Sequence, residues 1–475
     1  MTEKQQSASK NRGRLTTIIL AAGKGTRMKS PLPKVLHPVA GKSMLQRVVE
    51  RVQQVGCDEV RVVVGYGENL VRQVIEPTGA VCFKQVQQNG TGDAVKAAQP
   101  ETIEGTVLIL NGDHPLIQEE DLQSIMDDFH NSSDIMSVVT CRLKKPGSFG
   151  RIVRDSSGRF HGIVEAKDAS HETLKVREVN TGIYLMRAEA LNRYLPQVTN
   201  SNAQGEYYLT DVIGLAREAG EPVGTILAKP RVAFGVNDQS QLARASQVLF
   251  RMKAKKLMDD GVVILDPAHV YIEDSVQVGE ASVIYPGTFI RGATVIGRYC
   301  VIEPNCMLTN VTLEDSVQVR AMTHLEDCIL RQQAGVGPYA RLRPGTEIGE
   351  EAHVGNFVEM KKTKFGKGAK AGHLSYLGDA EIGKDVNIGC GTITCNYAVD
   401  RKKYKTIIGE GTFVGSDTQF VAPIEIGKDA VIASGSTITK NVPDNALAVA
   451  RGRQIVKENY TKSTSSASTE KTQEK

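Results

Sequence analysis

The chain contains 475 residues, and its 58 Lys and Arg nearly balance 54 Asp and Glu, which gives a formal net charge of +4. A charge this small does not indicate nucleic-acid binding, and the length exceeds what one hydrophobic core accommodates, so two or three domains are expected. No apolar run approaches the roughly 20 residues that span a bilayer, and residues 1–14 lack the apolar core of a signal peptide. We therefore expect a cytoplasmic protein with no membrane insertion and no nucleic-acid partner.

Residues 1–14 are polar and predict a disordered leader. From residue 15 to residue 237, β-branched runs alternate with helical patterns, which predicts a doubly wound α/β domain that binds ligands at the carboxyl ends of its strands. The clearest strands are Leu15–Ala21, Val60–Gly65, Thr106–Leu110 and Ile135–Cys141, and the clearest helices are Ser43–Val55, Thr91–Ala98 and Glu119–Phe129. The eight cysteines form no CxxC pair, so the sequence predicts neither a zinc site nor a redox motif.

A glycine-rich turn follows the first strand, in the segment AAGKGTRM that begins at Ala21. Glycine lets backbone N–H groups approach an anion, and Lys24 and Arg27 add positive charge. The third glycine of a dinucleotide-binding motif is missing, because Met28 occupies its place, and the segment ending at Gly41-Lys42-Ser43 lacks the first glycine of a Walker A loop. The turn therefore predicts a phosphate site of another kind, although a glycine turn can also be structural only.

Two further features point to the same edge of the sheet. The segment PLPK is extended and directs Lys34 back towards the strand ends. Asp113 comes just after a buried strand, where a carboxylate can bind Mg²⁺ together with substrate phosphates. The alternative, that Asp113 only stabilises a turn, is equally open from its position alone.

Residues 238–260 predict a linker helix, centred on Gln239–Met258, because they contain good helix formers and no helix breaker. Residues 261–455 then repeat an aliphatic residue every six positions. The repeat predicts a parallel β-helix with three hexapeptides per coil, so Ile272, Ile290 and Leu308 should stack. Residues 456–475 have almost nothing to bury and predict a disordered tail. Three series carry the repeat: from Ile272 through Val278, Ile284, Ile290, Ile296 and Ile302 to Leu308; from Val336 through Leu342, Ile348 and Val354 to Met360; and from Ile408 through Val414, Phe420, Ile426 and Ile432 to Ile438.

Polar residues on three successive coils predict a site on the outside of this β-helix. Ala371 and Leu377 hold aliphatic positions, so His373 between them should point outwards. The segments 372–376, 385–387 and 394–397 should lie close together, and residues 398–405 form a basic excursion that a binding loop would explain. The alternatives are a solvated histidine and a tolerated insertion.

The motifs LAAGKGTRM, PLPKVLH, QNGTGDA, NGDHPLI and NTGIY, in this order, resemble those of sugar-nucleotide pyrophosphorylases. With the hexapeptide region, residues 15–453 resemble the family of bacterial bifunctional N-acetylglucosamine-1-phosphate uridylyltransferases and glucosamine-1-phosphate N-acetyltransferases. The resemblance implies a Rossmann-like nucleotidyltransferase domain, a left-handed β-helix, a homotrimer and two reactions. Acetyl-CoA acetylates glucosamine 1-phosphate, and UTP then reacts with N-acetylglucosamine 1-phosphate to form UDP-N-acetylglucosamine and pyrophosphate.

The resemblance also implies roles for individual residues of the first domain. Asp113 and Asn237 would bind Mg²⁺, although nothing in the sequence alone points to Asn237. The nucleotide would contact Leu20, Ala21, Ala22, Gly23, Arg27 and Lys34, and its uracil would contact Gln85, Gly90 and Thr91. The sugar nucleotide would also contact Asn111, Gly112 and Asp113. Gly150, Glu165 and Asn180 would hold the sugar. Some relatives have Tyr in place of Asn111.

For the second domain, the resemblance implies that His373 is the base that deprotonates the amine. The sugar phosphate would contact Arg343, Lys361 and Lys403 (or Lys402, because the loop is one residue longer than in some relatives), with Tyr376 and Asn387 on the sugar. Acetyl-CoA would contact Asn396, Tyr397, Ser416, Ser434 (Ala in some relatives) and Arg451. Two alternatives are a nucleotidylyltransferase with a regulatory or oligomerising β-helix and a scaffold without activity. An inactive scaffold should have lost Lys34, Asp113 or the glycine-rich loop, but all are present. A protein with only the nucleotidylyltransferase activity would leave His373 and the basic loop unexplained.

Overall fold

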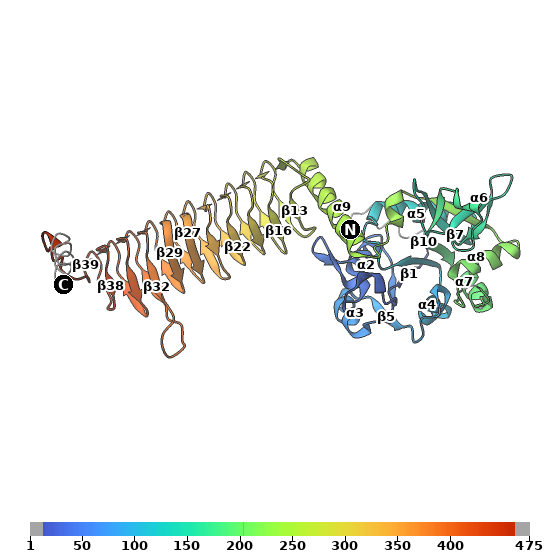
Figure 1. Cartoon of the computed structure of the whole chain (residues 1–475), viewed down its shortest axis with the longest axis horizontal. Coiled ribbons are helices and arrows are strands. Elements are labelled where there is room, and N and C mark those ends of the chain that lie inside the picture. The colour runs from blue at the N-terminus through green and yellow to red at the C-terminus, as the bar shows by residue number, and fades with distance from the viewer. Residues whose placement is uncertain (1–12, 203, 461–475) are drawn as a thin grey trace, which may run out of the picture. The chain divides into compact units, whose positions relative to one another are not determined.

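The computed structural model describes residues 13–202 and 204–460, so most of the predicted leader and tail lies outside the described residues. The chain divides into two compact units, and the boundary lies between Met252 and Lys253 (Figure 1). This boundary falls inside helix α9, Gln239–Asp259, which the sequence predicted as a linker helix. No helix in the described ranges has both the length and the apolar content that crossing a membrane requires.

The first unit is built on a twisted sheet with strand order β11-β7-β10-β6-β1-β4-β5. Strands β1, β4, β5 and β6 are parallel to one another, as are β7 and β11, whereas β10 runs antiparallel to both of its neighbours. The carboxyl ends of β1, β6 and β7 therefore lie at one edge. The strands are β1 Leu15–Leu20, β4 Glu59–Val64, β5 Val81–Lys84, β6 Thr106–Asn111, β7 Met136–Arg142, β8 Arg151–Arg154, β9 Phe160–Val164, β10 Glu178–Arg187 and β11 Val223–Leu227, with a small separate pair β2 Pro38–Val39 and β3 Lys42–Ser43.

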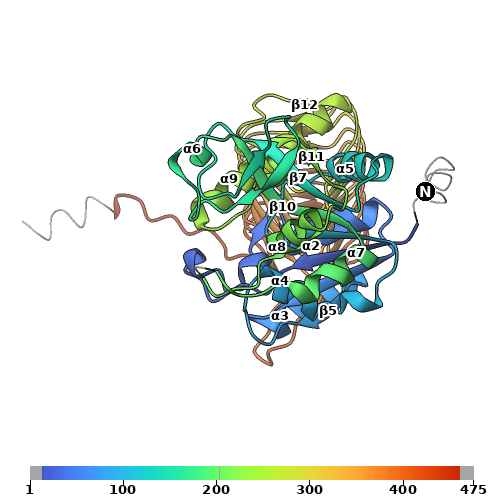
Figure 2. The same ribbon diagram turned by 90° about the vertical axis from the view of Figure 1, so that its right-hand side faces the viewer.

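Helices cover both faces of this sheet, because each buries one apolar stripe against it. Leu45, Val71 and Ile125 pack on one face, and Val95, Leu191 and Val212 pack on the other. Figure 2 labels both groups of helices. The first group is α2 Met44–Gln54, α3 Glu68–Ile75 and α5 Glu119–Asn131, and the second is α4 Thr91–Ala97, α7 Ala188–Tyr194 and α8 Leu209–Glu218; α6 is His171–Leu174, and 3-10 turns occupy η1 Thr26–Met28, η2 Lys34–Leu36, η3 Glu76–Thr78, η4 Pro100–Thr102, η5 Leu195–Gln197 and η6 Pro230–Ala233.

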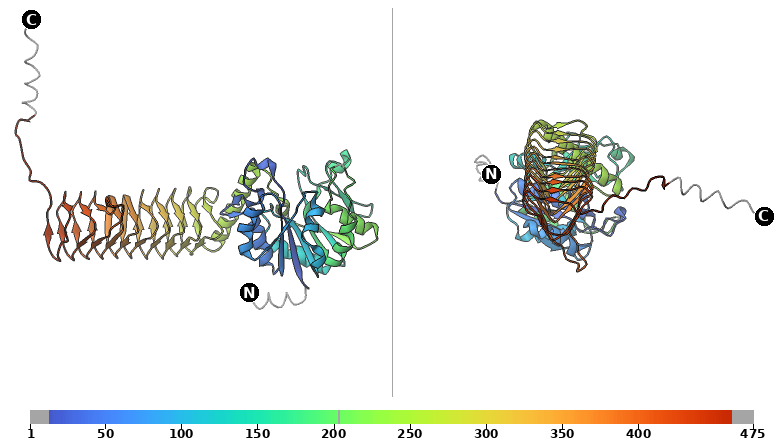
Figure 3. Two further views of the ribbon diagram at one scale, coloured as in Figure 1. Left: turned by 90° about the horizontal axis from the view of Figure 1, so that it is seen from below. Right: turned by 90° about the vertical axis from the view of Figure 1, so that its left-hand side faces the viewer.

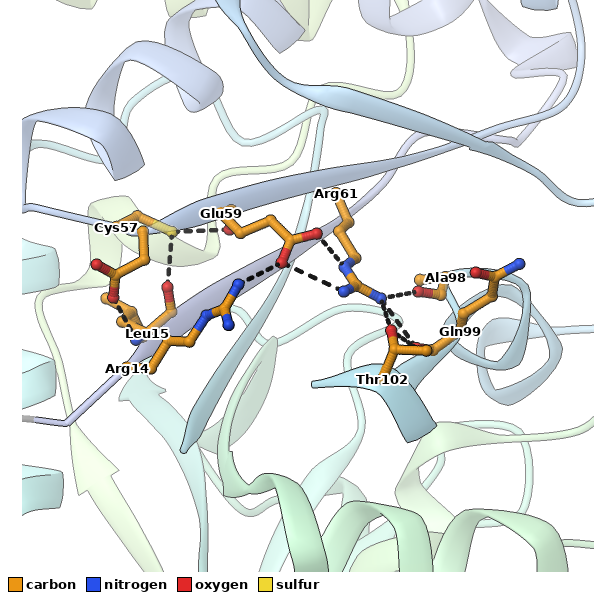
Figure 4. Close-up of polar contacts among 9 residues, drawn as sticks. Arg14, Leu15, Cys57, Glu59, Arg61, Ala98, Gln99 and Thr102 are labelled. Carbon is orange, nitrogen blue, oxygen red and sulfur yellow. Dashed lines mark hydrogen bonds and ion pairs between the residues drawn. The ribbon is translucent and has the colours of Figure 1, made fainter. Parts of the chain in front are cut away.

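A buried arginine fixes the end of helix α4. The Arg61 guanidinium, on β4, donates to the carbonyl oxygens of Ala98 at 2.8 Å and Gln99 at 2.9 Å, and to Thr102 Oγ1 at 2.8 Å (Figure 4). Glu59 accepts from the Arg61 Nε at 2.8 Å, which balances the charge. These bonds satisfy carbonyl groups that a helix leaves unpaired at its carboxyl end, and so they anchor the helix whose other end begins at Thr91.

The second unit is a left-handed parallel β-helix, as predicted, and its successive strands form regular rows (Figure 3). The predicted stacking is confirmed, since Ile272 pairs with Ile290, and Ile290 pairs with Leu308. The aliphatic positions line one continuous core from Ala254 and Leu257 of α9 to Val442. In the same unit, the Lys253 ammonium donates to the carbonyl oxygens of Asp274 and Val276 at 3.0 and 2.7 Å, which closes the first coil.

Up to β36, each coil contributes one strand to each of three faces, and β27 His353–Lys361 and β29 Lys370–Gly378 run without interruption from face one to face two. Face one contains β12 Val263–Ile264, β15 Val283–Ile284, β18 Val301–Ile302, β21 Gln318–Val319, β24 Gly335–Val336, β31 Asn387–Ile388, β34 Phe413–Val414, β37 Val431–Ile432 and β39 Leu447–Ala448. Face two contains β13 Tyr271–Ile272, β16 Phe289–Arg291, β19 Met307–Thr309, β22 His324–Glu326, β25 Arg341–Leu342, β32 Ile393–Cys395, β35 Gln419–Val421 and β38 Thr437–Ile438. Face three contains β14 Gln277–Val278, β17 Val295–Ile296, β20 Thr312–Leu313, β23 Cys328–Leu330, β26 Thr346–Ile348, β28 Lys364–Phe365, β30 Ala380–Ile382, β33 Thr406–Ile408 and β36 Ile424–Ile426.

The interruptions of the six-residue repeat have a simple structural cause. Several steps from face two to face three contain five residues instead of six, for example from Leu308 to Leu313 and from Met360 to Phe365. The buried position is kept at each of these steps, so the repeat changes phase without a break in the core.

Candidate functional sites

A cavity of about 510 Å³ lies at the carboxyl ends of β1 and β6. Most of the predicted nucleotide residues line it, namely Leu20, Ala21, Ala22, Gly23, Arg27, Lys34, Gln85, Gly90, Thr91, Asn111 and Asp113. Gly112 does not, because its backbone N–H donates to the Leu20 carbonyl at 2.9 Å and its α-carbon faces the Leu45 side chain. The predicted residues therefore come together at one sheet edge, with Gly112 in a supporting place.

The glycine-rich turn is held in a defined shape. The Ala22 carbonyl accepts from the Tyr66 backbone N–H at 3.0 Å and from Gln88 Nε2 at 2.8 Å. Gly25 has a φ of 62°, and a β-carbon there would lie 2.5 Å from Lys34 Cβ. A side chain at position 25 would therefore displace Lys34 as well as strain the backbone. The turn and Lys34 form one packed unit.

Lys34, Asp113, Asn237 and Arg27 converge beside this turn. The Lys34 ammonium forms an ion pair with Asp113 Oδ2 and donates to Asn237 Oδ1 at 2.7 Å. Arg27 Nη2 donates to the same Asn237 oxygen at 2.9 Å. Asn237 reaches this place because the Val236 N–H donates to the Asp113 carbonyl at 3.0 Å. Residues that lie far apart in the sequence thus form one charged corner.

The donors in this corner fit a hard cation. Asp113 Oδ1 is buried and has no hydrogen-bond partner among the residues described, and the Asn237 amide oxygen lies close by. Within residues 13–202 and 204–460 there is no cluster of three or more His, Cys, Asp or Glu residues that could hold a metal by itself. Mg²⁺ commonly binds through one or two protein oxygens together with substrate phosphates and water, so a corner with few protein donors suits it.

A second cavity, of about 380 Å³, adjoins the first, since Thr91, Asn111 and Glu206 line both. The predicted sugar residues Gly150, Glu165 and Asn180 line it. The pKa of the Glu165 carboxyl is raised by burial and, to a lesser degree, by the nearby charges of Asp168 and Asp211.

Side-chain and backbone hydrogen bonds hold the walls of the two cavities. The Asn180 amide donates to the Tyr184 hydroxyl at 2.8 Å, and burial raises the pKa of that hydroxyl. The Gly92 N–H donates to the Tyr207 carbonyl at 2.7 Å, and the Tyr207 N–H donates to the Asn89 carbonyl at 2.7 Å. These bonds join the predicted uracil segment to the segment that carries Glu206.

On the β-helix, His373 is exposed on β29, as the sequence predicted. Its Nδ1 lies 2.9 Å from Asn356 Oδ1, the residue in register with it on the previous coil. Because an amide oxygen can only accept, this contact favours the neutral tautomer with its proton on Nδ1, in which Nε2 is free to take a proton. Ser375 Oγ donates to the His373 carbonyl at 2.9 Å and fixes the backbone.

Three cations gather at the end of face two. The Arg343 backbone N–H donates to the Met360 carbonyl at 2.9 Å, so Arg343 lies on the coil next to Lys361. The charges of Lys403 and, second, Arg343 lower the pKa of Lys361. Arg343 is balanced by Glu359 at 2.9 Å, whereas no carboxylate lies within ion-pair distance of Lys361 or Lys403 among the described residues. Lys403 is held by its bridge to Tyr397 at the base of the loop, which leaves the β-helix near β32 in Figure 1.

Tyr376 and Asn396 lie beside the same end of face two. A β-carbon at Gly378 would lie 2.5 Å from the Tyr376 hydroxyl oxygen and 2.8 Å from Asn396 Nδ2, so both groups sit over this glycine. Asn396 Nδ2 donates to Asp379 Oδ2 at 2.5 Å. This glycine is therefore required by close approach and not by its φ angle.

The remaining predicted residues lie elsewhere on the β-helix. Ser416, Ser434 and Arg451 occupy consecutive coils at the corner between faces one and two: the Ser416 carbonyl accepts from the Gly435 N–H at 2.8 Å, and the Ser434 carbonyl accepts from Arg451 Nη1 at 2.8 Å. Asn387 lies on face one, in register with Lys370.

In a single chain, the candidate acetyltransferase residues therefore lie at two different corners of the three-sided β-helix. His373 lies at the corner between faces one and two, and the cations lie at the far end of face two. His373 and Gly378 are five residues apart on β29, which corresponds to at most about 16 Å at about 3.3 Å per residue. The expectation that stacking alone brings all these residues together holds only in part, because two residues on neighbouring coils meet only when they share a register position.

Four side chains at these sites were assigned no role from the sequence. Gln88 and Tyr184 belong to the motifs QNGTGDA and NTGIY but were not singled out within them, and they line the nucleotide and sugar cavities. Glu206, at both cavities, and Asn356, beside His373, lie outside the motifs. For Asn356 there was a usable signal, because it lies 17 positions before His373 and one coil contains 17 or 18 residues.

Comparison with known proteins agrees with this arrangement. Residues 17–231 match the MobA-like NTP transferase domain, residues 267–365 match the GMPPB C-terminal domain, and residues 405–440 match the bacterial transferase hexapeptide (six repeats). The chain is 60% identical to the bifunctional protein GlmU of Bdellovibrio bacteriovorus over 97% of its own length and 99% of that protein. It is 47% identical to bifunctional protein GlmU of Carboxydothermus hydrogenoformans, over 94% of its length and 99% of the relative, and 44% identical to that of Pelobacter propionicus, over 94% and 98%.

These matches extend over both units and confirm the predicted fold class and the predicted pair of transferase activities. The chain belongs to the family of bifunctional GlmU proteins.

Proposed function

We propose that uridylyl transfer takes place in the two adjoining cavities of the first unit and acetyl transfer takes place around His373 on the β-helix. The observation that best supports the first assignment is the convergence of Lys34, Asp113 and Asn237 beside the glycine-rich turn. The contact between Asn356 and His373 supports the second. In this proposal, residues 15–237 form the nucleotidyltransferase domain, 238–260 the linker helix and 261–455 the acetyltransferase domain.

For uridylyl transfer, UTP would occupy the 510 Å³ cavity and N-acetylglucosamine 1-phosphate the 380 Å³ cavity. The uracil would meet Gln85, Gly90 and Thr91, and the sugar would meet Gly150, Glu165 and Asn180. The sugar phosphate oxygen forms a bond to the α-phosphorus as the bond to pyrophosphate breaks. Because no covalent intermediate is required, the protein contributes by positioning both substrates and by neutralising charge with Arg27 and Lys34.

Asp113 and Asn237 would hold Mg²⁺, which neutralises charge on the transferred and departing phosphates. Lys34 contacts both residues, so it would share the phosphates with the cation. This role requires the Lys34 ammonium to leave Asp113 Oδ2 when nucleotide and metal bind. The other carboxylate oxygen, Oδ1, has no hydrogen-bond partner among the described residues, and His114 Nε2 lies 3.6 Å from it.

For acetyl transfer, the amine of glucosamine 1-phosphate gives a proton to His373 Nε2 and forms a bond to the carbonyl carbon of acetyl-CoA. The carbon–sulfur bond breaks, and the thiolate takes the proton back from the imidazole. Arg343, Lys361 and Lys403 would bind the sugar phosphate; their proximity to one another supports Lys403, in place of Lys402, as the loop residue. Tyr376 and Asn387 would contact the sugar, and Asn396, Tyr397, Ser416, Ser434 and Arg451 would contact acetyl-CoA.

The active form would be a homotrimer in the cytoplasm. Met322, Tyr339, Phe357 and Leu374 form an exposed apolar row with one residue per coil along the corner that carries His373, and their exposure ranges from 48% at Met322 to 59% at Leu374. A continuous exposed apolar row is typical of an interface. Contact with further copies of the chain would cover it, and it would bring the two separated corners of neighbouring copies together.

Two substitutions test this assignment. His373→Ala should abolish acetyl transfer and leave uridylyl transfer intact, whereas Asp113→Ala should do the reverse. Each activity is measured with its own substrates, acetyl-CoA and glucosamine 1-phosphate for one, UTP and N-acetylglucosamine 1-phosphate for the other. Loss of both activities in either folded variant, or retention of the targeted one, would contradict the assignment.

A further inference from the structure

The first turn of helix α9 contacts the Lys34–Asp113–Asn237 corner through side chains that neither the motifs nor the cavities single out. Asn237 comes two residues before the helix begins at Gln239, and Asp238 lies between them. The Asp238 carboxylate accepts from the Gln241 backbone N–H at 2.8 Å, and its carbonyl accepts from the Leu242 N–H at 3.0 Å. Asp238 is therefore the N-cap of the helix.

The Gln241 side chain makes a second hydrogen bond near the start of the helix, to the residue that precedes the N-cap. Its Oε1 accepts from the Asn237 backbone N–H at 2.7 Å. In a capping box, the side chain at the third helical position accepts from the N–H of the N-cap residue itself. Here the bond goes instead to the residue before the cap, and that residue carries the amide oxygen proposed to bind Mg²⁺. The backbone of Asn237 is thus fixed by the helix as well as by the contact of its neighbour Val236 with the Asp113 carbonyl.

A second glutamine ties the same turn to the glycine-rich segment. Gln239 Nε2 donates to the Met28 carbonyl at 3.0 Å, at the end of η1. The residue before Met28 is Arg27, whose guanidinium donates to Asn237 Oδ1 at 2.9 Å. Together these contacts form a closed ring. It runs from Asn237 to Arg27, along the chain to Met28, across to Gln239, along the helix to Gln241, and back to Asn237. Every member of this ring belongs to the first unit.

From this geometry we propose that Gln241 is a positioning residue of the uridylyltransferase site, with Gln239 in a supporting role. Gln241 holds the main chain of Asn237 so that its side-chain oxygen stays beside Lys34, which also pairs with Asp113. This inference rests on the proposed metal-binding role of Asn237. It explains why a polar residue, only partly exposed, occupies the first turn of a helix that otherwise connects two units.

The test compares three glutamine substitutions in the full-length protein. Gln241→Met removes the acceptor and keeps the length of the side chain, and Gln241→Glu keeps an acceptor that capping boxes use at this position. Gln247→Met is the matched control, because Gln247 is exposed on the same helix. Calorimetric titration with UTP and Mg²⁺, without sugar phosphate, measures binding with no turnover, and acetyl transfer reports on the remainder of the molecule.

We expect Gln241→Met to weaken binding of the Mg²⁺ complex of UTP by about threefold to tenfold, the range for loss of one hydrogen bond. Gln241→Glu and Gln247→Met should bind as the unaltered protein does, and acetyl transfer should not change in any variant. Equal binding by Gln241→Met and the unaltered protein would overturn the positioning role.

Asn237→Ala separates this inference from the proposal beneath it. If Asn237→Ala binds the complex normally, the metal role of Asn237 fails and the positioning role fails with it. If Asn237→Ala weakens binding and Gln241→Met does not, only the positioning role fails. Should Gln241→Met not fold, amide hydrogen exchange on the unaltered protein decides: the Asn237 N–H should be protected, and exchange at the rate of an open amide would refute the contact.

Discussion

The contact between Asn356 and His373 gives a direct prediction for acetyl transfer. Asn356→Ala removes the oxygen 2.9 Å from His373 Nδ1. The imidazole then loses the group that holds its proton on Nδ1 and its ring in place. A net hydrogen bond contributes about 1 kcal/mol, and about 1.4 kcal/mol corresponds to a tenfold change in rate, so kcat/KM should fall roughly fivefold.

This loss is small beside the removal of the base, since general base catalysis contributes about 100-fold to 10,000-fold. Asn356→Asp should have a different effect. A carboxylate beside the ring favours the protonated imidazole, so the acidic limb of the pH–rate profile should move to higher pH.

The assay follows release of the coenzyme thiol at saturating acetyl-CoA over a range of pH. Asn441→Ala is a suitable control, because Asn441 Oδ1 accepts from the Glu425 N–H at 3.0 Å on a later coil and lies far along the chain from His373. An unchanged rate in Asn356→Ala, together with an unmoved acidic limb in Asn356→Asp, would refute the proposed orientation of His373.

Four further predictions concern the remainder of the molecule. Because Lys403 lowers the pKa of Lys361, the KM for glucosamine 1-phosphate should rise as the pH passes upward through that lowered pKa, and Lys403→Gln should move this rise to higher pH; a pH-independent KM would contradict it. Truncation after Met258 should leave a folded uridylyltransferase without acetyl transfer, as judged by both assays, and an insoluble product would argue against independent units. Phe420→Ala should destabilise the β-helix by about 3–5 kcal/mol in chemical denaturation, because the side chain is fully buried in its core, and a change under about 1 kcal/mol would refute this. Phe357→Glu should shift the mass in analytical ultracentrifugation from trimer to monomer, and an unchanged mass would exclude this edge as the interface.

The sequence predicted the β-helix well because its signal is local and repeated. Each coil buries an aliphatic residue at a fixed interval, so the spacing of Ile272, Ile290 and Leu308 was enough to assign them to one stack. The five-residue steps were missed, because a shortened turn changes the phase of the repeat while the buried position is kept.

For the first unit, the sequence predicted the alternation of strands and helices but not the direction of every strand. Strand β10, Glu178–Arg187, is antiparallel to both neighbours, and no local feature of its sequence distinguishes the two directions. Asn237 illustrates the same limit for the site. It lies near Asp113 only because the chain returns, after β11, to the carboxyl ends of β1 and β6. The residues around Asn237 contain no local pattern that predicts such a long-range contact.

The positions of the acetyltransferase residues depend on features that the repeat does not encode. The register places His373 over Asn356, a pair that the sequence analysis did not predict although the length of one coil indicates it. In the proposed homotrimer, the relation between His373 and the cations of Arg343, Lys361 and Lys403 would depend on how neighbouring copies meet. One sequence would then contain all residues of the site without indicating which copy supplies each of them.

The most direct test of the account is the synthesis of UDP-N-acetylglucosamine by the purified full-length protein. The protein is given glucosamine 1-phosphate, acetyl-CoA, UTP and Mg²⁺, and each component is left out in turn. We predict that the nucleotide sugar forms only when all four are present. Formation without acetyl-CoA, or no formation with all four, would contradict the claim that one chain carries both transferase sites.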